Sequence, residues 1–382
     1  MGSVQNIEEL AAAALRRRTL IVILLLVVLV SVTGFVAQAY HRAKSDRAAE
    51  QFTLARDLLE RQQPEAALGP LRTAVALMPG ELPYRRALAF ALSAANHHDE
   101  ARSHLSSLLA IDPVDGEANL LMARLERDSP EVAERYYQRA IYGRWPADPA
   151  ERRLDVRFEL VDLLASRGET TKVKAELLRL AAEVPDEPSR LHQLAVRYLR
   201  VGEAENALEL YRRLVKHDPE DARARAGQAE AAFLARRFAE ARVAASTAVD
   251  LNPDDEASRR RLEIATRVVQ LDPLAARLSA RERARRAAIL LDRAVSELER
   301  CAGAGAPPAV MPEVSSTVTA AREQLEEAGA RPPASAMDSL VAAAEEAWRL
   351  RPSVCGRDAP PPPAELTYVF EKLQQSRDTA ER

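Results

Sequence analysis

Apolar residues recur three and four positions apart over most of the chain, and short stretches with proline or glycine interrupt them. This spacing is typical of amphipathic helices separated by turns. Aromatic residues make up only 4% of the chain, so alanine and leucine must fill most of the core. Such a core favours close helix-on-helix packing. The sequence therefore predicts an all-α fold.

Prolines recur at a fixed interval: Pro79 to Pro113, Pro185 to Pro219 and Pro219 to Pro253 are each 34 residues apart. Proline cannot continue a helix and disfavours helical geometry in the residue before it, so each one marks a turn into a new unit. Placing each proline at position 32 of a 34-residue unit brings the other positions into line. Each unit then has two helices joined by a turn.

The unit that ends at Pro219 shows the pattern clearly, with Ala195 at position 8, Gly202 at 15, Ala207 at 20 and Tyr211 at 24. Small residues at 8 and 20 let the paired helices touch, and glycine at 15 can adopt the left-handed conformation that ends the first helix. This pattern resembles the tetratricopeptide repeat family. The resemblance implies a right-handed helical solenoid, with about six repeats starting near residue 48.

The region after the repeats continues as helices. The helix expected from Glu256 to Leu271 would close the solenoid over residues 48–273, because the last repeat would otherwise expose its apolar face. A long helix is expected over 274–301. Residues 302–382 are expected to form a helical region interrupted by proline-rich linkers.

An apolar segment over residues 19–39 is long enough to cross about 30 Å of hydrocarbon as a helix. Three arginines at 16–18 directly precede it, which favours a cytoplasmic tail of residues 1–18. We expect a single transmembrane anchor in a bacterial-type inner membrane, with the repeats in the periplasm. Two alternatives stay open: cleavage after Ala39 as in a signal peptide, and the reverse topology, with the repeats in the cytoplasm.

Charge and motifs argue against several classes of function. The net charge is −3, with 54 basic and 57 acidic residues, so no basic field is available to bind nucleic acid. No phosphate-binding glycine motif or catalytic triad pattern is present, and we expect no cofactor, no small-molecule substrate and no enzyme activity. The histidines and acids at 97–104 lie at a predicted turn, where solvated polar residues are expected.

Cys301 and Cys355 are the only cysteines. In an oxidising compartment they can form a disulfide, which would stabilise the C-terminal region by up to about 4 kcal/mol on the chain-entropy estimate. The alternative is two unpaired cysteines.

In the family that the repeats resemble, the first helices line a concave face, where positions 2, 5, 9 and 12 meet a bound peptide. These positions here include four of the seven phenylalanines and two arginines, namely Phe52, Arg56, Arg86, Phe90, Phe158 and Phe233. The alternative is that the rings only pack between neighbouring repeats. The groove lacks the lysine and asparagine of the chaperone-tail clamp, so a chaperone adaptor is disfavoured.

These features together predict a membrane-anchored scaffold or assembly factor that binds a partner protein or peptide on the concave face of the repeats. Most of the chain would lie outside the cytoplasm. The main alternative is a regulatory adaptor that faces the cytoplasm. An enzyme in the C-terminal third is a weaker alternative.

Overall fold

The computed structural model describes residues 2–302, 316, 318–320, 322–323, 326, 333–355 and 360–380; the side chains of 2–25, 27, 301–302 and 378–380 lie outside this description. Within these ranges every regular element is a helix, and an isolated parallel bridge joins Asp115 to Arg144. The predicted all-α repeat solenoid is confirmed for this part of the chain. The chain divides into two compact units, Met1–Glu169 and Thr170–Arg382.

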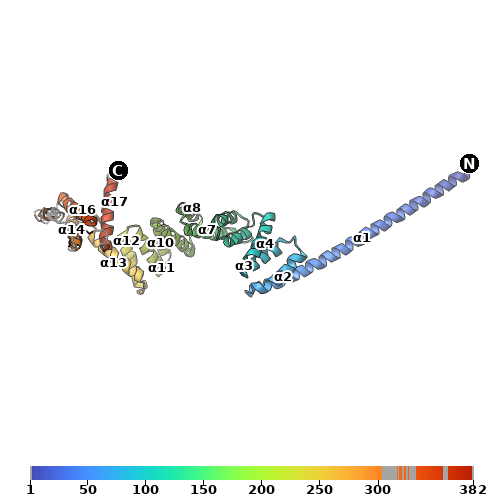
Figure 1. The fold of residues 1–382 in the computed structure, drawn as a ribbon, viewed down its shortest axis with the longest axis horizontal. Coiled ribbons are helices and arrows are strands. Elements are labelled where there is room, and N and C mark those ends of the chain that lie inside the picture. The colour runs from blue at the N-terminus through green and yellow to red at the C-terminus, as the bar shows by residue number, and fades with distance from the viewer. Residues whose placement is uncertain are drawn as a thin grey trace. The chain divides into compact units, whose positions relative to one another are not determined.

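The first unit consists of successive helices that pack as neighbours along the chain (Figure 1). They are α1 (Gly2–Glu60), α2 (Pro64–Leu77), α3 (Leu82–Ala94), α4 (His98–Ile111), α5 (Gly116–Leu125), α6 (Pro130–Ile141) and α7 (Pro149–Ser166). Pairs α1–α2 and α3–α4 are the two-helix units that end at Pro79 and Pro113, as the proline spacing predicts, and α5–α6 forms a third pair.

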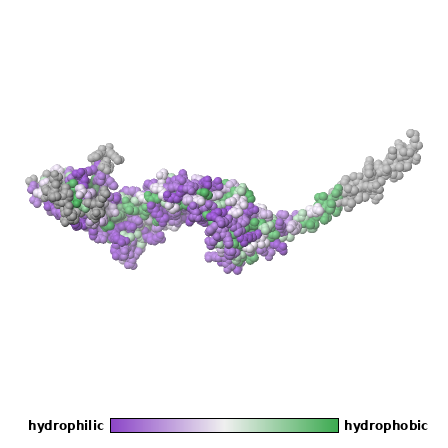
Figure 2. Space-filling model, viewed as in Figure 1, coloured by the Kyte–Doolittle hydropathy of each residue, from purple (hydrophilic) through white to green (hydrophobic). Residues whose placement is uncertain are grey.

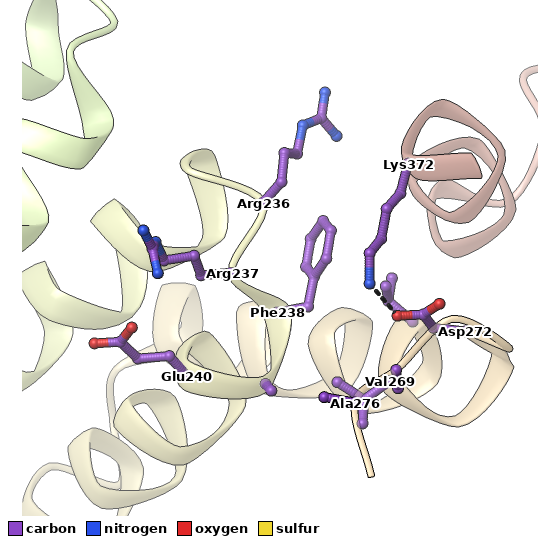
Figure 3. A pocket seen from close by; sticks show the side chains of 11 residues that line it. Arg236, Arg237, Phe238, Glu240, Val269, Asp272, Ala276 and Lys372 are labelled. Carbon is purple, nitrogen blue, oxygen red and sulfur yellow. Dashed lines mark hydrogen bonds and ion pairs between the residues drawn. The ribbon is translucent and has the colours of Figure 1, made fainter. Parts of the chain in front are cut away.

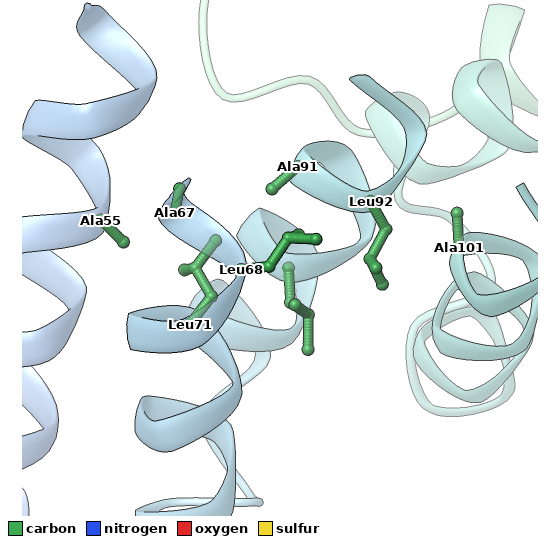
Figure 4. Close-up of a cluster of buried hydrophobic side chains, with 8 residues drawn as sticks. Ala55, Ala67, Leu68, Leu71, Ala91, Leu92 and Ala101 are labelled. Carbon is green, nitrogen blue, oxygen red and sulfur yellow. The ribbon is translucent and has the colours of Figure 1, made fainter. Parts of the chain in front are cut away.

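Alanine and leucine form the core of the first repeats, as the low aromatic content predicts. Ala55 and Ala67, at positions 8 and 20 of the first repeat, are fully buried and face each other between α1 and α2 (Figure 4). Leu71 of α2 lies beside them, and Leu92 of α3 lies beside Ala101 of α4. Because a buried leucine side chain contributes about 1.5 to 3 kcal/mol, these contacts stabilise the first two repeats.

The third helix pair departs from the regular repeat in the loop after α6. The ring of Trp145 lies on Gly116, where an added Cβ would come within 2.6 Å of it. The indole Nε1 donates a hydrogen bond to the carbonyl of Ala140 at 2.9 Å. A glycine is therefore needed at the start of α5 because the tryptophan covers it.

The second unit contains α8 (Thr170–Glu183), α9 (Pro188–Arg200), α10 (Ala204–His217), α11 (Ala222–Leu234), α12 (Phe238–Leu251), α13 (Glu256–Leu271), α14 (Ala280–Ala302), α16 (Ala334–Cys355) and α17 (Ala364–Ala380). Gly202, at position 15, has a φ of +77° and ends α9 in the predicted left-handed conformation. In the first unit, Gly168 follows α7 at the equivalent position 15 and has a φ of +71°.

The long helix after the repeats begins later than the sequence suggests, and the helices that follow pack on it and on the solenoid. The long helix α14 starts at Ala280 because the chain turns after α13, where the carboxylate of Asp272 accepts a hydrogen bond from the N–H of Leu274 at 2.9 Å. Helices α14 and α16 pack closely together, and α17 lies against α13. The helix expected to close the solenoid is thus itself covered.

The predicted anchor falls within α1, which continues as one helix through residues 19–39 and into the first repeat. Among the residues whose side chains are described, no helix has an apolar stretch long enough to cross a membrane. Residues 19–25 of the predicted anchor lie outside that set. Cys355 is disulfide-bonded, but the side chain of Cys301 is outside the description, so the pairing of the two stays a prediction.

Candidate partner-binding groove

The predicted groove positions of the first two repeats lie on α1 and α3. The rings of Phe52 on α1 and Tyr84 on α3 are 4.7 Å apart between centroids and tilted by 41°. Both side chains are half-buried, and Phe52 also packs against the alanine and leucine core. This contact joins the first helices of two adjacent repeats.

Further along, both helices carry exposed groups. Phe90 on α3 is 36% exposed. The side chain of Arg56 on α1 is 66% exposed, and Glu60 approaches it only to 3.9 Å, a solvent-exposed pair that contributes little. We call the surface formed by Phe52, Arg56, Tyr84 and Phe90 the α1–α3 face. It offers an aromatic ring and a guanidinium group, both accessible to solvent.

Arg86, also predicted to lie in the groove, is committed to a structural ion pair. Its Nε donates a hydrogen bond to the carboxylate of Asp115 at 2.9 Å, and one terminal nitrogen donates to the same oxygen. Asp115 is only 3% exposed, and its other oxygen accepts a hydrogen bond from the N–H of Ala118 at the start of α5. Arg86 therefore neutralises a buried carboxylate that caps the next repeat.

Phe158 on α7 is only 3% exposed, so little of its ring is available to a partner. Next to it in sequence, Glu159 accepts hydrogen bonds from Arg124 Nε at 3.0 Å and from the hydroxyl of Tyr137 at 3.1 Å. The hydrogen bond to Glu159 raises the pKa of Arg124, and burial raises the pKa of Tyr137. These polar groups satisfy one another and hold α5, α6 and α7 together.

Phe233 on α11 is covered by another helix of the same chain. The ring of Tyr368 on α17 meets it edge-on at 5.3 Å and also lies 5.3 Å from Phe238 at the start of α12. The guanidinium of Arg236 lies 4.5 Å from the centre of the Tyr368 ring and pairs with Glu371 at 2.6 Å. Helix α17 therefore occupies this groove position with an aromatic and an acidic side chain.

A cavity of about 300 Å³ lies beside this contact, between the start of α12, the end of α13, and α17 (Figure 3). Lys372 reaches into it from α17 and pairs with Asp272. Leu366, Val369 and Leu373 of α17 are buried, and Phe370 stacks on Trp348 of α16 at 4.6 Å. Lys372 and Arg236 thus hold α17 beside the cavity, whereas Arg237 and Glu240 pair with Glu205 and Arg212 of the repeats.

Sequence reasoning missed Tyr84 and the group around Tyr368. Tyr84 lies two residues before Arg86 on the same helix. An aromatic residue so close to a predicted groove position could have been predicted to contact the groove. Tyr368 lies far along the chain, in a region without a family resemblance, and no repeat position points to it.

The polar residues around the turn before α4 form ordinary surface contacts. His97 lies 3.1 Å from Glu65, and His104 lies 3.8 Å from Glu100. In the part of the chain that the structure describes, no group of three or more histidine, cysteine or acidic side chains is arranged to hold a metal ion.

A family model described as tetratricopeptide repeat matches residues 58–125 and 198–263. No curated protein matches the chain. Among solved structures, YrrB, described as a TPR protein with an unusual peptide-binding site, is 15% identical, with 50% of this chain and 97% of that one covered and a TM-score of 0.41. The pilF protein of Pseudomonas aeruginosa is 17% identical, with 57% and 97% covered and a TM-score of 0.41. PilW, described as a widely conserved type IV pilus biogenesis factor, is 18% identical, with 56% and 98% covered and a TM-score of 0.40.

Proposed function

The chain carries tetratricopeptide repeats, and we propose that it is a membrane-anchored scaffold that binds a segment of a partner protein on the α1–α3 face. The observation that carries this proposal is that Phe90 and Arg56 are both exposed on the first helices of adjacent repeats. Aromatic and arginine side chains are the types that most often dominate the energy of a protein interface. A partner with an apolar side chain over Phe90 and an acid near Arg56 fits this surface.

The second unit supports the proposal, because a helix of the same chain packs against Phe233 on the first helix of its repeat. Helix α17 places Tyr368 against Phe233 and Glu371 against Arg236. An aromatic ring and an arginine thus receive a helix that carries a ring and an acid. The α1–α3 face also offers an aromatic ring and an arginine, and in the described part of the chain Phe90 remains exposed.

The apolar part of α1 supports a membrane anchor over residues 19–39. Within its described part, Val28, Leu29 and Val30 are all exposed. Successive residues of a helix are turned by about 100°, so these three side chains point to three different sides of α1. A helix that is apolar on all sides is suited to the interior of a bilayer. Figure 2 shows this apolar stretch on α1 beside the polar surface of the repeats.

We place the repeats outside the cytoplasm, in a periplasmic compartment, with a single pass through the inner membrane. The three arginines at 16–18 directly precede the apolar segment and favour a cytoplasmic N-terminus. A reporter that works only in the cytoplasm, fused after Arg382, should be inactive. An active reporter would favour the alternative of a regulatory adaptor that faces the cytoplasm.

The binding proposal is tested with Phe90→Ala in the full chain. Truncating an anchor residue commonly lowers affinity by about 2 kcal/mol or more, roughly thirtyfold. The partner that co-purifies with the wild-type chain should be lost from the Phe90→Ala chain. Leu178→Ala on α8 is the matched control, because Leu178 is 71% exposed and does not lie at a predicted groove position. Equal loss with both variants would contradict the proposal.

A further inference from the structure

The α1–α3 face and the predicted membrane anchor share one helix. Phe52 and Arg56 lie on α1, and α1 continues without a break from Gly2 to Glu60. No glycine or proline occurs between Phe35 and Gln63, and these are the residues at which helices usually kink. A rigid rod therefore connects the anchor to two residues of the candidate binding surface.

This rod fixes the height of the α1–α3 face above the membrane. The predicted anchor ends at Ala39, and Phe52 and Arg56 follow Tyr40 by 12 and 16 residues. At 1.5 Å per residue, they lie about 18 and 24 Å further along the axis of α1. The headgroup layer occupies roughly the first 5 to 8 Å of this distance. The binding surface thus stands a short way above the headgroups.

The rod also fixes the direction in which the surface points. Ala48 is the first fully buried residue of α1, so the contact of α1 with α2 begins only eight residues after Tyr40. A partner free in solution gains nothing from a fixed height and direction, and a flexible linker would present the repeats to it equally well. A partner that is itself held in the membrane benefits, because a matched geometry raises its effective concentration.

The charge of this part of α1 indicates the chemistry of the partner. The stretch of α1 next to the predicted anchor, from Tyr40 to Arg47, carries Arg42, Lys44 and Arg47 against one acid, Asp46, whereas acids balance the basic residues further along. Arg42 and Arg47 are exposed. This excess of positive charge would attract an acidic segment close to the membrane surface.

We infer that the partner is an integral membrane protein, and that the α1–α3 face binds its acidic juxtamembrane segment, with an apolar side chain over Phe90 and an acid at Arg56. This inference rests on the proposed anchor and groove. The bound segment lies within about 25 Å of the hydrocarbon, a distance that roughly 16 helical or eight extended residues cover.

The class of partner is tested by photocrosslinking in native membranes. A photoreactive phenylalanine analogue replaces Phe90 in the full chain, and a protease recognition sequence of equal length that keeps basic residues at positions 42 and 44 replaces residues 41–46, so that the charge and the spacing along α1 are kept. After irradiation, cleavage separates the repeats from their own anchor. A crosslinked protein that holds the repeats in the membrane pellet through a carbonate wash is the expected result. The same analogue in place of Leu178 is the control and should not capture that protein.

Other outcomes of this experiment are equally decisive. A crosslinked protein that is released with the repeats overturns this inference but leaves the proposed groove standing. Attachment to lipid alone shows that the basic stretch binds headgroups, and it also overturns the inference. If no adduct forms at position 90, both the groove and the inference fail.

The fixed height is tested by lengthening α1. Seven alanines inserted between Asp46 and Arg47 raise the α1–α3 face by about 10 Å and turn it by only about 20°. The yield of the membrane-protein adduct should fall about tenfold or more, because the two binding sites no longer match in height. The melting temperature of the repeats should stay unchanged, since the insertion precedes the first buried residue, Ala48. An unchanged yield would overturn the inference.

Discussion

Phe90 on α3 and Phe233 on α11 lie on the first helices of their repeats, yet their surroundings differ. Phe90 is 36% exposed, with the exposed Arg56 on the neighbouring first helix. Phe233 is covered by Tyr368, and the arginine near it is paired with Glu371. Among the residues that the structure describes, Phe90 thus remains exposed, whereas the C-terminal helix covers Phe233.

This difference shows that a repeat position alone does not decide whether a side chain binds a partner. The surroundings decide, because a ring that is already buried by the same chain gains little area from a further contact. Among the predicted groove residues, Phe90 and Arg56 are the best placed for binding, whereas Phe158, Arg86 and Phe233 are engaged within the fold.

The largest expected effect on stability concerns Phe158, a predicted groove residue that is buried within the fold. Phe158→Ala should lower the free energy of unfolding by about 3 to 5 kcal/mol, because the ring is almost fully buried and its removal leaves a cavity. Thermal or chemical unfolding of the full chain measures this change. A loss below about 1 kcal/mol would show that Phe158 does not pack as described, and it would weaken the contrast with Phe90.

The next largest effect on stability concerns Cys355 at the end of α16, the helix that packs against α14. If Cys355 pairs with Cys301, Cys355→Ser should destabilise the second unit by up to about 4 kcal/mol on the chain-entropy estimate. Mass mapping without reduction identifies the pair, and unfolding measures the effect. Full alkylation of both thiols in protein taken directly from cells would rule out the disulfide.

A smaller effect tests how α17 is held on the repeats. Phe233→Ala and Tyr368→Ala should each destabilise the second unit by about 2 kcal/mol, because both rings are partly buried. Combined, they should show a coupling of about 0.5 to 1.5 kcal/mol, as expected for an aromatic pair in contact. Strictly additive losses would mean that the two rings do not interact.

The smallest effect is a dependence on pH in the second unit. Burial, with a contribution from the charge of Arg223, lowers the pKa of His192 below its ordinary value of about 6.5. The unfolded chain therefore binds the proton more readily than the folded chain, and stability should fall as the pH drops from 7 to 5. Comparing the wild-type chain with His192→Gln over this range isolates the contribution. An identical pH profile for the two chains would contradict it.

Much of the repeat architecture follows from the sequence because its causes are local. Gly202 ends α9 in a left-handed conformation, and Ala55 and Ala67 let α1 and α2 touch, as the repeat positions predict. The pairing of Arg86 with Asp115 was not predictable, because it depends on the cap of the following repeat. The contact of Tyr368 with Phe233 joins segments far apart in the chain, and no local pattern encodes it.

The measurement that tests the central claim most directly compares binding and stability in Phe90→Ala. The claim is that Phe90 belongs to an available binding surface, unlike Phe158 and Phe233. The variant should retain less than about a tenth of the co-purifying partner while its unfolding free energy changes by less than about 1 kcal/mol. A variant that unfolds early but binds its partner normally once folded would contradict the claim. It would show that Phe90 only packs between neighbouring repeats.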